Sequence, residues 1–129
     1  MPVGEIEKTI NTPFDFTNTR KIGEQINYDN KQLKIAMGYD HCFVLKKETE
    51  IAAEISEKTS GRKLTISTNH PGVQLYTGNH LSEKFNKNQG LCLETQCFPN
   101  SPNNDNFPST MLKANSQYYS TTSYIFSNI

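Results

Sequence analysis

The sequence predicts an all-β chain, folded as an antiparallel β-sandwich of short strands. Three observations predict this fold class. Apolar and polar residues alternate with a period of two in several short runs. Clusters of Gly, Pro and Asn separate these runs as turns. No stretch has helical periodicity of ordinary length. Short alternating strands at regular spacing are typical of sandwiches, and we expect roughly six to eight strands in a single domain.

The first half of the chain contains one helical candidate and three predicted strands. A short turn after Pro13-Phe14-Asp15-Phe16 is the only helical candidate. In residues 39–45 the large side chains at odd-numbered positions share one face, which leaves Asp40 on the other. Residues 51–56 and 64–67 alternate in the same way on either side of a Ser-Gly turn, so we expect them to form a hairpin.

Loops separate the predicted strands of the second half. Gln74 lies on the opposite face of a short strand from its two apolar neighbours. An apolar strand-like run begins at Leu91 and ends at Glu94, and the β-branched and aromatic residues 118–126 have high strand propensity. Residues 79–90 are rich in Asn and Lys, which predicts a mobile loop. Residues 99–108 contain three prolines, which predict a second loop.

The charge balance and hydropathy exclude several classes of partner. Thirteen Lys and Arg residues balance thirteen Asp and Glu residues, so no basic stripe is available to bind phosphates and we expect no nucleic acid partner. Only 34% of the residues are hydrophobic and the mean hydropathy is −0.67, which predicts a thin core. Neither a membrane-spanning run nor a secretory leader is recognisable, so we expect a soluble, cytoplasmic protein with no membrane partner.

Three cysteines, Cys42, Cys92 and Cys97, are an odd number without a C-x-x-C pair. A structural zinc site needs such a pair or a tight Cys/His cluster. We therefore expect no disulfide framework, no metal and no cofactor. Cys42 and Cys92 lie in apolar strand-like runs, which predicts buried, inert thiols. Free thiols agree with a reducing compartment.

Glu94 is the candidate for acid–base chemistry that the residues themselves indicate. It lies near the end of an apolar strand-like run, just before a loop rich in Pro and Asn at residues 99–103. A strand fixes the backbone of such a group, and a loop can form the wall of a site. The alternative is an exposed charge at a strand end. Asp40 and Gln74 likewise point away from an apolar layer, toward either solvent or a cleft.

Several segments, in order along the chain, resemble one known family. They read Gly-Tyr-Asp-His-Cys-Phe-Val-Leu at 38–45, His-Pro-Gly-Val-Gln-Leu-Tyr-Thr-Gly-Asn at 70–79, Cys-Leu-Glu-Thr-Gln at 92–96 and Tyr-Ser-Thr-Thr-Ser-Tyr-Ile-Phe at 119–126. Shorter matches occur at Pro2-Val3-Gly4-Glu5-Ile6, at 12–16 and at 60–62. Together they resemble the C-terminal portion of the aldose 1-epimerase (galactose mutarotase) family, which implies that residues 1–129 are part of a single galactose mutarotase-like supersandwich domain.

The resemblance implies interconversion of the α and β anomers of aldohexoses such as glucose and galactose. By residue-wise match, Glu94 takes the position of the catalytic base, and Asp40 and Gln74 take positions that hydrogen-bond sugar hydroxyls. The family's catalytic acid is a histidine in its N-terminal portion, which this chain does not contain. His41 is expected to be a packed structural residue, and neither His70 nor His80 matches the acid. We therefore expect an incomplete enzyme.

Other interpretations of the sequence remain open. A non-catalytic carbohydrate-binding or remnant domain would keep the scaffold without the acid. A glycosidase would use Asp40 and Glu94 as paired carboxylates, but this reading explains none of the surrounding motifs. Besides an aldohexose, the expected partner is either the missing N-terminal portion of the domain or a second copy of the chain.

Overall fold

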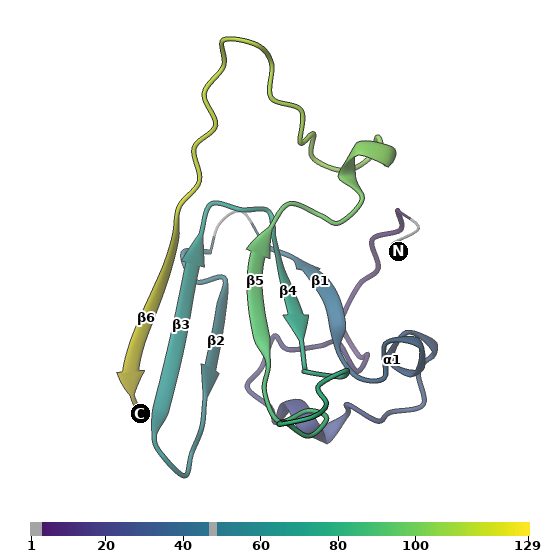
Figure 1. The fold of residues 1–129 in the computed structure, drawn as a ribbon, viewed down its shortest axis with the longest axis vertical. Helices are drawn as coiled ribbons and strands as arrows, with labels where there is room; N and C mark the ends of the chain where they lie inside the picture. Colours follow the sequence, from purple (N-terminus) through teal and green to yellow (C-terminus); the bar gives the residue numbers. More distant parts are fainter. Residues whose placement is uncertain (1–3, 47–48) are drawn as a thin grey trace. The chain divides into compact units, whose positions relative to one another are not determined.

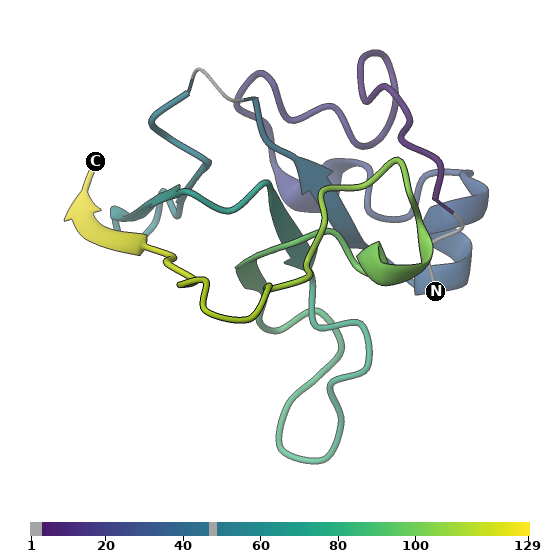
Figure 2. The same cartoon turned by 90° about the horizontal axis from the view of Figure 1, so that it is seen from above.

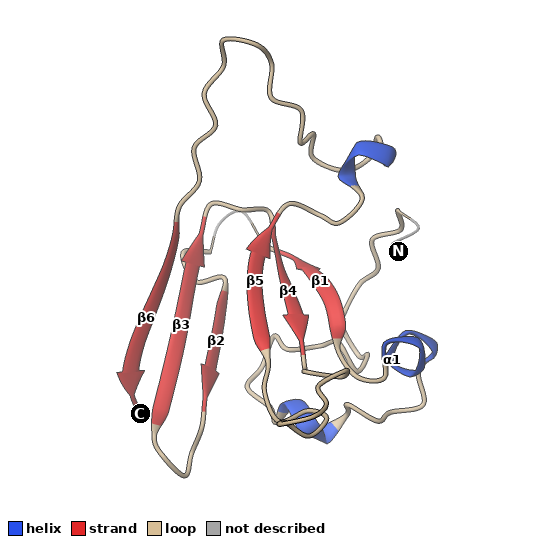
Figure 3. Cartoon of the chain, in the orientation of Figure 1, coloured by secondary structure: helices blue, strands red, loops and turns tan. Residues whose placement is uncertain are grey.

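The structure, a computed structural model, describes residues 4–46 and 49–129. Pro2 and Val3, which open the matching segments, lie outside the described residues. Strands are the main regular structure of the described chain, and helices are few and short (Figure 3), so the predicted all-β fold class is confirmed. The elements are, in order, η1 (Ile22–Glu24), α1 (Lys31–Ala36), β1 (Asp40–Val44), β2 (Ala53–Ser56), β3 (Arg62–Thr68), β4 (Gly72–Tyr76), β5 (Cys92–Gln96), η2 (Ser101–Asn103) and β6 (Thr122–Asn128).

Two compact units divide the chain. Unit 1 comprises Gly4, Cys42–Gln74 and Leu93–Ile129, and unit 2 comprises Glu5–His41 and Leu75–Cys92. Unit 1 contains a whole three-stranded sheet of order β2-β3-β6 and most of each strand of a second sheet of order β1-β4-β5 (Figure 1). Unit 2 contains η1, α1 and the long loop between β4 and β5 (Figure 2).

The predicted hairpin is confirmed as β2 and β3, which pair antiparallel with Ala53 opposite Ile66. Alternation explains the register, because a shift of one residue would turn Ile66 to the other face. Ile66 is fully buried. On the exposed side, the ammonium of Lys63 lies 2.7 Å from a carboxylate oxygen of Glu54, a surface pair of the kind that contributes little to stability.

The last strand, β6, pairs antiparallel with β3, with Thr68 opposite Thr122. We predicted strand structure from residue 118, but β6 begins at Thr122 and continues to Asn128. Asn69, the first residue after β3, explains the difference, because it bonds to Thr121 through its backbone and its side chain. Its backbone N–H donates to the Thr121 carbonyl at 3.2 Å, and its side-chain oxygen accepts from the Thr121 N–H at 2.9 Å. Residues before Thr121 therefore have no β3 residue to pair with.

Gly72 begins β4 and permits close packing in the core of unit 1. A Cβ at this position would lie 2.8 Å from Sγ of Cys42 and 3.2 Å from Cδ1 of Phe98, closer than nonbonded atoms normally pack. Phe98 is buried, and its ring meets that of Phe107 edge-on at 5.2 Å between centroids. A side chain at position 72 would push Cys42 or Phe98 out of this core.

A short helical turn does follow Phe16, as predicted, but it begins several residues later, and the prediction missed the helix α1. The 3-10 turn η1 begins only at Ile22, and the α-helix α1 covers Lys31–Ala36. Six residues are too few to display helical periodicity, so the amphipathic signal was absent from the sequence. Leu33 is the buried residue of α1. Among the described residues, the helices are too short and too polar to cross a lipid bilayer.

Capping residues fix both ends of α1. At its start, the Asn30 side-chain oxygen accepts from the N–H groups of Gln32 at 2.8 Å and Leu33 at 3.4 Å. At its end, Met37 adopts a left-handed conformation with φ of 57°. The Gly38 N–H then donates to the Leu33 carbonyl at 3.0 Å, the bond of a Schellman motif. The helix therefore stops just before Tyr39, where the chain enters β1.

The cysteines in the described chain are free thiols. Cys42 is half-buried, and burial raises the pKa of its thiol, while a hydrogen bond with the Gln96 side chain opposes that shift. Our expectation of a buried thiol at Cys92 is wrong, because this residue is exposed. It stands two positions before Glu94 on β5 and therefore shares its exposed face.

Glu57 caps the turn between β2 and β3, and we predict that its pKa lies near 2. Its carboxylate oxygens accept from the Thr59 N–H, the Ser60 N–H and the Ser60 hydroxyl, each at 2.7 Å. These bonds, with the Ser60 hydroxyl first, lower the pKa from its ordinary value of 4.5 to about 2. The resulting stabilisation is present above pH 4.5 and is lost as the pH falls through about 2.

An NMR titration of the Glu57 carboxyl carbon checks this value. Ser60→Ala removes the hydroxyl and should move the pKa back toward 4.5, whereas Ser116→Ala, at an exposed site elsewhere, should leave it unchanged. An ordinary Glu57 pKa in the unmodified chain would contradict the capping role.

We also predict that the isolated chain is marginally stable and associates with itself. Strand β6 is an edge of its sheet, and its apolar side chains Tyr124, Ile125 and Phe126 are 48%, 54% and 80% exposed. Unpaired edges with apolar residues favour association. Sedimentation velocity should show concentration-dependent oligomers that Phe126→Lys reduces and that Thr110→Lys, in an exposed loop, does not. Cooperative unfolding of a demonstrably monomeric sample would show the prediction to be mistaken.

Candidate functional site

Glu94 is the central residue of β5 and is exposed. Its neighbours Leu93 and Thr95 are half-buried on the opposite face of the strand. The hydroxyls of Thr95 and Thr122 form a hydrogen bond of 2.7 Å, which ties β5 to the first residue of β6 within unit 1. We placed Glu94 at the end of its strand, but β5 extends two residues further to Gln96. Its carboxylate therefore projects from a fixed backbone.

Gln74 is the central residue of β4, between the buried side chains of Val73 and Leu75. It is half-buried itself, so the predicted alternation on this strand is confirmed. Strand β4 is the neighbour of β5 in the sheet. The structure thus brings Gln74 and Glu94 onto adjacent strands of unit 1. An amide both donates and accepts hydrogen bonds and a carboxylate accepts them, so each side chain is suited to binding hydroxyl groups.

Asp40 is the first residue of β1 and is exposed. Tyr39 before it is fully buried, so the predicted opposition of the two side chains is confirmed. The Asp40 N–H donates to Nδ1 of His41 at 3.0 Å. Asp40 belongs to unit 2, whereas Gln74 and Glu94 belong to unit 1, so their convergence on one sugar stays a prediction.

His41 is a packed structural histidine, as predicted. Its ring meets that of Phe14 at 4.6 Å between centroids. Burial lowers the pKa of its imidazole, although the charge of Asp40 opposes this shift. Because Nδ1 accepts from the Asp40 N–H, the neutral ring carries its proton on Nε2. The other two histidines act through their backbones: the His70 N–H donates to the Thr68 hydroxyl, and the His80 N–H to the Tyr76 hydroxyl, each at 3.1 Å.

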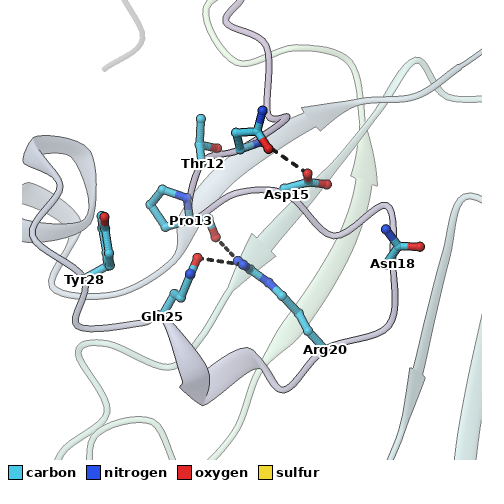
Figure 4. A pocket seen from close by; sticks show the side chains of 8 residues that line it. Thr12, Pro13, Asp15, Asn18, Arg20, Gln25 and Tyr28 are labelled. Carbon is cyan, nitrogen blue, oxygen red and sulfur yellow. Dashed lines mark hydrogen bonds between the residues drawn. The ribbon is translucent and has the colours of Figure 1, made fainter.

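A polar cavity of about 350 Å³ lies among the loops of unit 2 (Figure 4). None of the predicted site residues lines it. Arg20 extends along it and donates to the Gln25 side-chain oxygen at 2.6 Å, to the Pro13 carbonyl and to the Tyr39 hydroxyl at 3.3 Å. The guanidinium also lies 4.5 Å from the centre of the Phe16 ring. Because these donors are engaged within the loop, we assign Arg20 to bracing Tyr39. The cavity is lined by Asn11, Thr12, Pro13, Asp15, Asn18, Arg20, Gln25 and Tyr28.

Metal chemistry has no candidate centre in residues 4–46 and 49–129. No three His, Cys, Asp or Glu side chains group there in a way that could hold a metal ion. The carboxylate and amide side chains on the strands are suited to hydrogen bonding with hydroxyl groups, and a carboxylate can transfer a proton.

Two three-stranded sheets, one of which carries a carboxylate and an amide on adjacent strands, define a β protein, and comparison with known proteins identifies its family. The chain belongs to the aldose 1-epimerase family, whose model matches residues 1–125. Galactose mutarotase of Sus scrofa is 36% identical over 98% of this chain and 39% of its own length. Aldose 1-epimerase of Escherichia coli (strain K12) is 30% identical over 98% of this chain and 40% of its own length.

A solved structure agrees with this assignment. The aldose epimerase homologue from C. elegans superposes with a TM-score of 0.87 at 27% identity, over 99% of this chain and 40% of that one. The chain therefore spans about 40% of the length of the relatives it matches. Its fold is that of the corresponding part of a galactose mutarotase.

Proposed function

We propose that this chain supplies the catalytic base and part of the sugar site for the interconversion of aldohexose anomers. The observation that carries the proposal is the position of Glu94. It lies in the family motif Leu-Glu-Thr-Gln, on a strand adjacent to the one that bears Gln74, in a chain that belongs to the aldose 1-epimerase family. Residues 1–129 are, in this proposal, the C-terminal portion of one domain.

The reaction opens and recloses the sugar ring. Glu94 removes the proton of the C1 hydroxyl, and the electron pair released forms the C1 carbonyl as the bond from C1 to the ring oxygen breaks. The ring oxygen takes a proton from an acid on the other side. Rotation about the bond between C1 and C2 presents the opposite carbonyl face, and the reverse steps give the other anomer. No net change in atoms or electrons occurs, so no cofactor is needed.

Asp40 and Gln74 bind sugar hydroxyls in this proposal. The exposed carboxylate of Asp40 accepts hydrogen bonds, and the half-buried amide of Gln74 both accepts and donates. Binding through rigid strand residues orients the hemiacetal toward the base, which is the main contribution of such contacts to catalysis.

The acid is the part that this chain does not supply. Burial lowers the pKa of His41, whose ring packs against Phe14, and the backbones of His70 and His80 belong to turns. Because the chain spans about 40% of its relatives' length, we propose that the N-terminal portion of the domain provides the acid. A cytoplasmic location is supported by the three free thiols.

The test is polarimetry on a chimera. The chimera joins this chain to the part of Sus scrofa galactose mutarotase that lies outside the match. That part is placed before this chain. The chimera should interconvert the anomers of D-galactose or D-glucose, and Glu94→Gln should remove most of that rate, because a general base contributes about 10²–10⁴-fold. Glu50→Gln, an exposed residue outside the strands, is the matched control and should leave the rate unchanged.

Two outcomes would count against the proposal. Substantial anomer exchange by the 129-residue chain alone would mean that one of its own histidines is the acid. A chimera that binds sugar while Glu94→Gln leaves the exchange rate unchanged would favour the alternative of a non-catalytic carbohydrate-binding domain.

A further inference from the structure

Asn79 is a buried amide in the loop that follows β4, only 4% exposed. Its Nδ2 group donates to the Ala36 carbonyl at 2.8 Å and to the Tyr39 carbonyl at 2.9 Å. Its Oδ1 atom accepts from the Thr77 hydroxyl at 2.7 Å and from the Asn88 side chain at 3.1 Å. These bonds use both donors and both lone pairs of the amide. A flipped amide would aim its oxygen at two carbonyls, so the partners fix its orientation.

Thr77 completes the network with a single hydroxyl. The Thr77 oxygen accepts from the Tyr39 N–H at 3.0 Å. Its one hydrogen points to Oδ1 of Asn79 at 2.7 Å, closer than the Tyr39 carbonyl at 3.2 Å. Thr77 is 3% exposed, so removal of the hydroxyl would leave the Tyr39 N–H buried without an acceptor, a costly change.

Gly38 and Asn88 close the network on its two sides. Gly38 adopts φ of 143°, and a Cβ there would lie only 2.3 Å from Oδ1 of Asn79 and 3.0 Å from Oγ1 of Thr77. Only glycine therefore allows the chain to enter β1 so close to these side chains. From the other side, the Asn88 amide donates to the Thr77 carbonyl at 2.8 Å, which ties the far end of the loop to the same point.

The network reaches the peptide group that leads into Asp40 at its carbonyl. The Tyr39 carbonyl accepts from the Thr77 N–H at 3.0 Å and from Nδ2 of Asn79 at 2.9 Å. This carbonyl and the Asp40 N–H belong to one rigid peptide plane, and the N–H donates to Nδ1 of His41. Both ends of that plane are thus held, so the direction in which the Asp40 side chain leaves the backbone is restricted.

We propose that Thr77 and Asn79 are positioning residues that aim the exposed carboxylate of Asp40 for hydrogen bonding to an aldohexose. This inference rests on the proposed role of Asp40 as a sugar ligand. Neither residue touches the sugar: they act through the Tyr39 peptide. Preorganisation of this kind reduces the entropy lost when the ligand binds.

A double-mutant cycle on the chimera described under the proposed function tests the proposal, with D-galactose as the probe and NMR shift changes as the measure of affinity. Thr77→Val keeps the shape but removes the hydroxyl, and it should weaken binding roughly tenfold, the size expected for coupled neighbours. Thr77→Ser restores the hydroxyl and should restore the affinity. Thr68→Val removes a hydroxyl that has three partners, all of them in unit 1, and should have no effect on affinity.

The decisive comparison is made in the Asp40→Ala background. There Thr77→Val should cause no further loss of affinity, because the group that it positions is gone. The same loss in both backgrounds, or no loss in either, would overturn the inference. If Thr77→Val does not fold, Asn88→Ala, which removes only the outer donor, carries the same cycle with the same expectation.

Failure of the proposed function has a different signature. If the unmodified chimera and its Asp40→Ala variant bind D-galactose equally, Asp40 is not a sugar ligand. If neither binds it, the proposed function fails. In both cases the positioning role is overturned as well. If Asp40→Ala weakens binding but Thr77→Val does not, the sugar site stands and only the inference is overturned.

Discussion

The burial of Tyr39 is the constraint on which unit 2 depends. This residue is fully buried, yet its hydroxyl and backbone groups all require hydrogen-bond partners. The hydroxyl donates to the Pro13 carbonyl at 2.8 Å and accepts from Arg20. The rings of Phe14 and Phe16 meet the Tyr39 ring edge-on. The N-terminal loop is therefore organised around one side chain, and burial raises the pKa of its phenol.

The same residue joins the N-terminal loop to the loop after β4. At its backbone, Thr77 and Asn79 satisfy the N–H and carbonyl groups. Two segments far apart in sequence thus meet at one buried tyrosine, and Asp40 is the next residue along the chain. In unit 1, apolar packing fixes the backbone near the proposed site residues, and Gly72 leaves space there for Cys42 and Phe98. The side chain of each proposed sugar-binding residue therefore extends from a backbone segment that buried neighbouring residues hold in place.

Sequence pattern predicted the local features well, because alternation is a local property. The β2–β3 hairpin, the opposite directions of Tyr39 and Asp40 and the burial on both sides of Gln74 all follow from a period of two. The roles of Asp40, Gln74 and Glu94 came instead from the family resemblance, since an exposed strand carboxylate looks the same with or without a function. The short helix α1 was not predicted, because six residues are too few to show helical periodicity.

Features that depend on distant partners could not be predicted. Composition marked residues 79–90 as a solvated loop, but Asn79 is buried because it reaches the carbonyl of Ala36, 43 residues away. The start of β6 depends on Asn69, 52 residues from Thr121. Asparagine is common in exposed turns, and only the fold decides which asparagines become buried network members.

Native-state hydrogen exchange tests the central role of Tyr39 most directly. The Tyr39 amide donates to Oγ1 of Thr77, and the Thr77 amide donates to the Tyr39 carbonyl. These two amides should be the most strongly protected from exchange in unit 2. They should exchange far more slowly than the Phe85 amide in the exposed loop. Tyr39→Phe, which removes only the hydroxyl, should speed both together by roughly fivefold, the effect of one lost buried hydrogen bond. Exchange of Tyr39 and Thr77 at the rate of Phe85 would contradict the account.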